Sequence, residues 1–234
     1  MKVLAIDTSN FTLGIALADR GQVVGEYITN LKKNHSVRVM PAIQTLLKDC
    51  DTKPEDLDRI VVAKGPGSYT GVRIGVTIAK TLAWTLKIPL SAVSSLEVLA
   101  ANGRHFQGMI SPLFDARRGQ VYTGLYAFSE DGTIQTVMED CNMLSSEWGK
   151  QLHELGKPVL FVGQDMDLHR EALTEAMGDQ AFFAPASLFN PRPGELALIG
   201  SERPEEDIHH FVPNYIRMAE AETKWLEQQA EKNK

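Results

Sequence analysis

The sequence predicts an α/β protein of two similar domains, because one order of strands and helices occurs twice along the chain. Strand-like segments at 3–7, 12–18 and 22–28 precede a helix at about 36–49, the strand RIVVA, a helix ending near residue 87, the strand PLSAV and the short helix SLEVLAAN. The second half has strands at 109–115, 119–128 and 133–139, a helix near 146–155, a strand at 158–163 and a helix near 167–177. Two βββαβα units with mixed sheets should face each other across a cleft. We expect domains at 1–103 and 104–234, with 102–108 as the boundary and a last helix at 217–234.

The composition indicates an ordinary globular protein and argues against direct binding of nucleic acid. The 234 residues are 43% hydrophobic and 23% charged, with a formal net charge of −6. Cys50 and Cys141 lie far apart and form no CxxC motif, and the chain has neither a secretory leader pattern nor an apolar run long enough for a membrane span. We therefore expect a cytoplasmic protein that makes no membrane contact.

The glycine-rich stretch KGPGSYTGVRIG, residues 64 to 75, precedes an apolar helix and is open to two interpretations. A glycine turn at a helix N-terminus can bind a phosphate through free N–H groups and the helix dipole. The spacing nevertheless fits neither the Walker loop nor the dinucleotide-binding fingerprint. The alternative is a turn whose glycines only allow a strand and a helix to pack closely.

Several motifs, in this order, give the chain a specific resemblance over nearly its whole length. They are AIDTSNFTLGIAL, HSVRVMPAI, GPGSYTGVRIGVTIAKTLA, IPLSAVSSLEVLA, FDARRGQVY and PNYIR. The chain resembles the bacterial TsaB (YeaZ) family. This resemblance implies a duplicated actin-like ATPase (ASKHA) fold, as in sugar kinases and Hsp70. It also implies a noncatalytic partner of the paralogous enzyme TsaD, which with the ATPase TsaE makes threonylcarbamoyladenosine in tRNA. A homodimer is implied when TsaD is absent, and contact with tRNA only through the complex.

The catalytic positions of the paralogous enzyme are replaced in this chain. The enzyme's family has a motif of the form NHxEGH whose two histidines bind the metal, and the matching residues here are SSLEVL, 94 to 99. Ser95 and Leu99 stand where the resemblance places the two histidines, and neither side chain can replace an imidazole on a transition metal. We expect no catalytic residue, no metal and no cofactor.

The residues that correspond to nucleotide-binding positions of active relatives are also altered. The resemblance places a phosphate loop at the turn 115–119, where Arg117 and Arg118 offer side-chain donors in place of a close backbone cradle; a salt-bridged turn is the alternative. Asp7 could orient magnesium, but more simply accepts hydrogen bonds from nearby turn N–H groups. The vestigial nucleotide or phosphate site would comprise Asp7, Thr8, Gly65, Gly67, Ser68, Gly71, Arg117 and Arg118. A small actin-like ATPase or kinase using Asp7 and the 65–71 loop remains the alternative function.

The two helices of the first domain carry more apolar residues than a single sheet should cover, which predicts a partner-binding surface. The basic residues Arg73, Lys80 and Lys87 repeat every seven positions on the second helix and would lie at the rim of that surface. The expected interface comprises Val39, Met40, Ile43, Leu46, Leu47, Val72, Arg73, Val76, Ala79, Lys80 and Ala83. Ile43→Asp or Val76→Asp should then weaken the heterodimer and leave the monomer folded.

Overall fold

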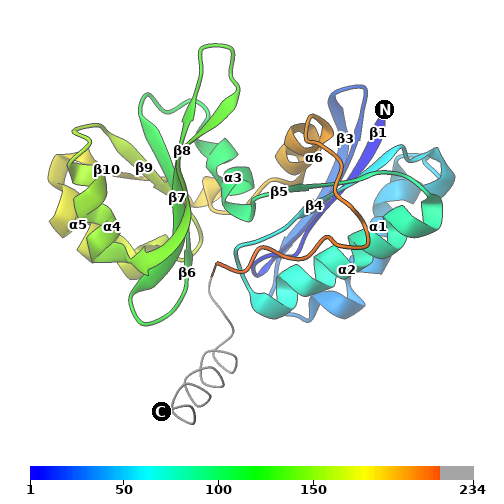
Figure 1. Cartoon of the computed structure of the whole chain (residues 1–234), viewed down its shortest axis with the longest axis horizontal. Coiled ribbons are helices and arrows are strands. Elements are labelled where there is room, and N and C mark those ends of the chain that lie inside the picture. The colour runs from blue at the N-terminus through cyan, green and yellow to red at the C-terminus, as the bar shows by residue number, and fades with distance from the viewer. Residues whose placement is uncertain (217–234) are drawn as a thin grey trace, which may run out of the picture.

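A computed structural model describes residues 1–216 and shows two five-stranded mixed sheets (Figure 1). The first sheet has the order β3-β2-β1-β4-β5, with β1 at Lys2–Asp7, β2 at Thr12–Asp19, β3 at Gln22–Asn30, β4 at Arg59–Ala63 and β5 at Leu90–Val93. The second has the order β10-β9-β6-β7-β8, with β6 at Met109–Asp115, β7 at Gln120–Phe128, β8 at Ile134–Leu144, β9 at Val159–Val162 and β10 at Ala181–Phe183. In both sheets the first three strands are antiparallel and the later strands pair in parallel. The predicted duplication of one mixed α/β unit is therefore confirmed.

Helices cover these sheets as crossover connections require. The first sheet carries α1 (Val39–Asp49), preceded by the 3₁₀ turn η1 (His35–Val37), together with α2 (Tyr69–Leu86) and α6 (Pro193–Ser201). The second carries α4 (Ser145–His153) and α5 (Met166–Met177), and α3 (Ser95–Ala100) lies between the sheets (Figure 1). Within residues 1–216, the helices are all too short or too polar to span a bilayer.

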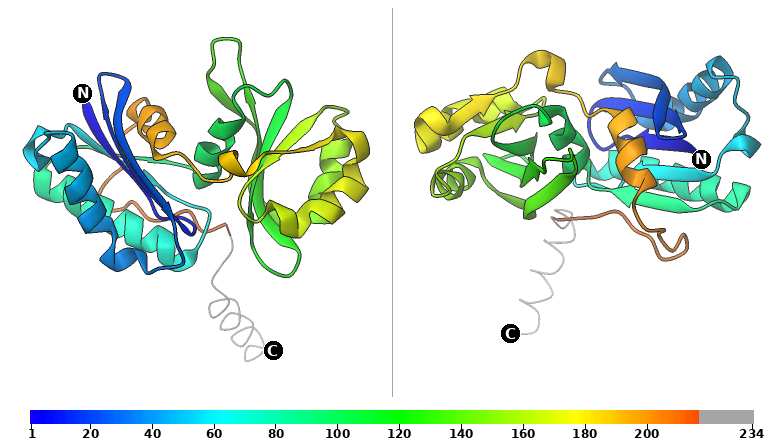
Figure 2. Two further views of the ribbon diagram at one scale, coloured as in Figure 1. Left: turned by 180° about the vertical axis from the view of Figure 1, so that it is seen from behind. Right: turned by 90° about the horizontal axis from the view of Figure 1, so that it is seen from above.

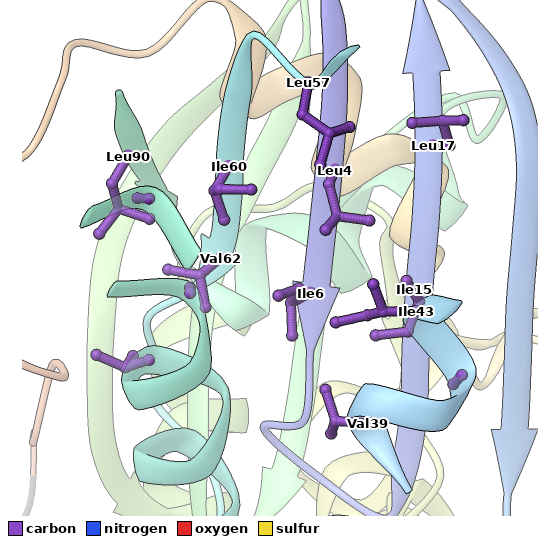
Figure 3. Close-up of a cluster of buried hydrophobic side chains, with 14 of the residues drawn as sticks. Leu4, Ile6, Ile15, Leu17, Val39, Ile43, Leu57, Ile60, Val62 and Leu90 are labelled. Carbon is purple, nitrogen blue, oxygen red and sulfur yellow. The ribbon is translucent and has the colours of Figure 1, made fainter. Parts of the chain in front are cut away.

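The first sheet is buried on both faces, because helices pack on each of them. Strands β1 and β2 are apolar and buried at nearly every position, which is typical of strands covered on two sides. On one face, Leu4, Ile6 and Ile15 meet side chains of α1 and α2 (Figure 3). On the other face, Val3 and Ala5 meet Leu196 of α6.

The position of α6 corrects the predicted domain boundaries. The sequence assigned all residues from 104 onward to the second domain, but α6 packs on β1 and β2 of the first sheet (Figure 2). The reason is the apolar back face of that sheet, where Leu196 and Ala197 of the returning helix α6 pack against Val3 and Ala5. The expected helix at 217–234 lies outside the described residues.

Residues 203–216, here called the C-terminal strap, bring the chain from α6 to α2. The strap passes the edge strand β5, where the Glu206 N–H donates to the Leu90 carbonyl at 2.8 Å. It then follows α2 (Figure 1), where the Lys80 ammonium donates to the Phe211 carbonyl at 2.7 Å and the Phe211 ring joins the core. The Asn214 N–H donates to the Lys64 carbonyl at 2.7 Å. The strap thus protects a sheet edge and closes one side of the first core.

Phe211→Ala should destabilise the first domain, because the ring is only 8% exposed and its removal leaves a cavity beside α2. We expect a loss of about 3 kcal/mol in the free energy of unfolding, measured by urea titration. Phe182→Ala is the matched control, since that ring is 44% exposed and should cost under about 1 kcal/mol. Equal losses in the two variants would show that the strap does not belong to the core.

Candidate functional site

The glycine loop after β4 packs directly against the turn that follows β1. A Cβ atom at Gly67 would stand 2.2 Å from the Ser9 carbonyl oxygen, and one at Gly71 would stand 2.2 Å from the Thr8 carbonyl oxygen. At Gly75, one turn further along α2, it would stand 2.5 Å from the Thr8 hydroxyl. These distances are too short for any side chain, so the three glycines are required for close packing of α2.

Several backbone N–H groups of the loop already donate hydrogen bonds to oxygen atoms of the protein itself. The Ser68 N–H donates to the Ser9 carbonyl at 2.7 Å, and the Gly71 N–H to the Ser68 hydroxyl, which caps α2, at 3.3 Å. The Gly65 N–H donates to the Ser95 hydroxyl at 3.1 Å. A phosphate cradle needs such N–H groups free and convergent. The geometry therefore favours the packing interpretation of the loop over the phosphate-binding one.

Asp7 is buried beneath this loop. Its Oδ1 accepts from the Ser9 N–H at 2.8 Å, which confirms the expected turn contact, while Oδ2 has no hydrogen-bond partner among the described residues. Burial raises the pKa of Asp7. The hydrogen bonds from Ser9, and the electrostatic effect of the nearby His35, lower it by a smaller amount. A raised pKa disfavours the anion that would attract a magnesium ion.

The second predicted phosphate position is a tight hairpin turn between β6 and β7. Arg117 and Arg118 both have left-handed backbones, with φ of 68° and 56°, and the Gln120 N–H donates to the Arg117 carbonyl at 3.0 Å. The neighbouring Asp115 carboxylate lies 3.0 Å from Nε2 of the buried His169. The structure therefore places Arg117 and Arg118 on the second sheet, and Asp7, Thr8 and the glycine loop on the first.

Hydrogen bonds join the two domains across the space between the sheets. The Gln164 amide, on the loop after β9, donates to the Thr12 hydroxyl of β2 at 2.8 Å and also contacts Asn190. The Thr12 hydroxyl in turn donates to the Asn190 side chain at 3.3 Å. Gly163, the single glycine of this loop, is required for packing, since a Cβ there would stand 2.2 Å from the Leu113 carbonyl.

A second connection between the domains involves residues 94–99, the segment that the resemblance matches to the metal-binding motif of the paralogous enzyme. The Ser94 hydroxyl, which caps α3, and the Tyr126 hydroxyl both donate to the Asp140 carboxylate of β8, the latter at 2.5 Å. Burial raises the pKa of both Asp140 and Tyr126. Ser95 accepts from the Gly65 N–H, and Leu99 is completely buried in the core between the domains. The two residues at the histidine positions therefore make structural contacts. Residues 1–216 hold no cluster of three His, Cys, Asp or Glu side chains that could bind a metal ion.

Most of the predicted interface side chains point inward, so that part of the prediction was wrong. The side chains buried in the first core are Val39, Ile43, Leu46, Leu47, Val72, Val76, Ala79 and Ala83. Figure 3 shows Val39 and Ile43 directed from α1 toward the strands. Among the expected interface residues, Arg73 and Met40 are exposed and Lys80 is half-buried beneath the strap. The helical period predicted a wide apolar stripe correctly. The stripe is covered partly by Phe211 and Ile208 of the strap, however, and not by a partner protein.

The outward face of α2 is different in character and forms a groove with η1. Thr70, Thr77 and Thr81 lie seven and eleven residues apart along one stripe, with Ile74 and Ile78 half-buried beside them. The groove has a volume of about 530 Å³ and is lined by Ser36, Tyr69, Thr70, Arg73, Ile74, Thr77 and Ile78. Exposed Val37 and Trp84, at 69% and 65%, extend the apolar surface at either end. The threonine stripe and Tyr69 were not among the predicted site residues, although the regular spacing of the threonines was an available signal.

Comparisons with known proteins agree with this fold. A Pseudomonas aeruginosa protein described as similar to peptidase YEAZ superposes with a TM-score of 0.79 and 25% identity, over 92% of this chain and 99% of the other. YeaZ from Pseudomonas aeruginosa superposes with a TM-score of 0.76 and 24% identity over the same shares. The chain therefore shares the two-domain α/β fold of YeaZ-type proteins.

The sequence comparisons name the family within that class. Residues 22–225 match the profile of the family described as TsaD, tRNA N6-adenosine threonylcarbamoyltransferase. The tRNA threonylcarbamoyladenosine biosynthesis protein TsaB of Bacillus subtilis is 60% identical over 98% of this chain and 100% of its own length. Its Escherichia coli namesake is 33% identical over 63% of this chain and 69% of its own length. The chain belongs to the TsaB family.

Asp7→Asn should change stability in a pH-dependent way. Because the folded-state pKa lies above the unfolded value of about 3.9, the ionised carboxylate costs stability, increasingly so as the pH rises from about 4 through the folded pKa. We expect Asp7→Asn to raise the thermal unfolding midpoint at pH 7.5 and to change it little at pH 4. Asp131→Asn is the control of opposite sign, since hydrogen bonds from Ser129 and Thr133 lower the pKa of Asp131 to about 2. A lower midpoint for Asp7→Asn at pH 7.5 would mean that the folded protein stabilises the anion.

Ile43→Asp should unfold the first domain, contrary to the expectation from sequence. Ile43 is 3% exposed, and an unpaired carboxylate at this position should cost over about 4 kcal/mol in the free energy of unfolding. Met40→Asp on the same helix, where the side chain is 38% exposed, should fold normally. Circular dichroism melting of both variants decides the matter, and a folded Ile43→Asp protein would restore the original assignment of α1.

Proposed function

We propose that this chain is a noncatalytic subunit of the complex that makes threonylcarbamoyladenosine in tRNA. In this role it binds and activates the catalytic subunit TsaD and works together with the ATPase TsaE. The proposal rests on the 60% identity to Bacillus subtilis TsaB and on the exposed groove of α2. A role in tRNA modification would place the protein in the cytoplasm.

The groove fits a helix of a partner protein. Threonines at positions 70, 77 and 81 are small enough to let another helix approach closely, and Ile74 and Ile78 provide an apolar floor. Trp84 and Val37 are large apolar side chains that a partner would remove from water. The same surface on a second copy would support the homodimer expected when TsaD is absent. Binding of tRNA would then occur through the complex.

The enzymatic alternative, a small ATPase or kinase, receives less support. It requires Asp7 as an anion and free N–H groups in the 65–71 loop. Burial raises the pKa of Asp7, and the loop donors Gly65, Ser68 and Gly71 bond to protein atoms. The hydrogen bonds from Gln164 to Thr12 and from Ser94 to Asp140 further tie the two domains together.

The test is reconstitution of the modification from purified TsaD and TsaE, with and without this chain. Thr77→Trp should fill the groove, weaken binding to TsaD at least tenfold and reduce the modification in proportion, because Thr77 lines the groove. Thr77 is exposed, so the variant should keep its fold. Thr174→Trp on α5 is the matched control, since it is an exposed threonine on a helix of the other domain.

The control variant should bind and support modification like the wild type. If wild-type protein neither copurifies with TsaD nor increases the modification, the proposed function is wrong. If Thr77→Trp binds normally, the partner uses another surface.

A further inference from the structure

The C-terminal strap ends at the border of the α2 groove. The Tyr215 ring contacts the Tyr69 ring, with centroids 5.1 Å apart, and Tyr69 lines the groove. The Arg73 guanidinium donates to the Tyr69 hydroxyl at 2.6 Å and lies 5.1 Å from the ring centroid. Tyr69 therefore contacts both a side chain of the strap and a cation of its own helix.

The position of Tyr215 is fixed by the residues that precede it. Asn214 is bonded through its N–H to the Lys64 carbonyl, and Phe211 is packed in the first core. Lys80 binds the strap carbonyls at Phe211 and His209. Tyr69 and Lys80 are eleven residues apart, so both lie on one edge of α2 while Thr77 faces outward. The strap thus runs along one edge of the outward face, and η1 stands at the other.

The charges around the groove indicate the chemistry of its occupant. The segment Tyr69–Leu86 contains no acidic residue, and Arg73 stands at the mouth of the groove. Lys32 and Lys33, just before η1, are exposed. Arg73 is the one charged residue among the described residues that line the groove, in a chain whose net charge is −6. An apolar floor with a basic rim is complementary to an amphipathic helix that carries carboxylates beside its apolar stripe.

We propose that Tyr215 is a positioning residue of the docking surface. By packing its ring against Tyr69, it fixes Tyr69 and Arg73 at the groove, so that the partner helix contacts a surface made jointly by α2 and the strap. This inference rests on the proposed function, because the occupant is taken to be an amphipathic helix of TsaD. The strap then determines specificity as well as covering the first core.

The experiment measures the dissociation constant for TsaD with full-length chains by calorimetry. Tyr215→Ala should weaken binding about five- to tenfold, because Tyr69 and Arg73 lose their fixed orientation. Tyr215→Phe keeps the ring and should bind within twofold of the wild type. A double-mutant cycle with Tyr69→Ala adds a measure that a purely structural role would not affect. The two losses should be non-additive, since both changes break one contact.

The outcomes separate the inference from the function on which it rests. If Tyr215→Ala binds like the wild type while Thr77→Trp does not, the role of Tyr215 is refuted and the docking surface stands. Additive losses in the cycle, or an equal loss in Tyr215→Phe, also refute it. If the wild-type chain fails to bind TsaD, both the inference and the proposed function fail.

Discussion

The contact between the turn after β1 and the glycine loop after β4 determines the rest of this structure. The carbonyl oxygens of Thr8 and Ser9 lie so close to Gly71 and Gly67 that a Cβ atom at either glycine would collide with them. The Ser68 N–H donates to the Ser9 carbonyl. This contact fixes the start of α2 against β1. It also uses hydrogen-bond donors that a phosphate would need. One set of glycines therefore accounts for a well-packed helix and for the limited capacity of the loop to hold an anion.

The same arrangement extends from the loop to the second domain. Ser95 bonds the glycine loop to α3, and the neighbouring Ser94 bonds α3 to Asp140 of the second sheet. Gln164 joins the second domain to Thr12 at the beginning of β2. Each of these polar side chains is satisfied by another part of the protein, so the space between the sheets is occupied by structural contacts. The surface that we propose for binding other molecules is therefore an outer one, the outward face of α2.

The sequence predicted the repeated fold well because its main signals are local. Strand alternation, helical periodicity and glycine positions are properties of neighbouring residues, and the two βββαβα units follow from them. The family resemblance also placed Ser95 and Leu99 at the positions of missing metal ligands, and both prove to make packing contacts.

The errors arose where distant segments meet. Nothing near α2 in the sequence shows that Phe211, over a hundred residues later, covers one side of the helix. The apolar stripes of Ile43 and Val76 were therefore assigned to a partner instead of to the core. The same reason explains why α6 was placed in the wrong domain, since its neighbours β1 and β2 lie at the other end of the chain. Periodicity gives the width of an apolar face but does not identify the segment that buries it.

The most direct test of this account is titration of the isolated chain with ATP and magnesium in a calorimeter. A loop closed onto Thr8 and Ser9 predicts no saturable heat with nucleotide up to about 1 mM, a concentration at which a site of even weak affinity is detected. Stoichiometric binding at micromolar nucleotide would contradict the account. It would show that the glycine loop opens to accept a phosphate.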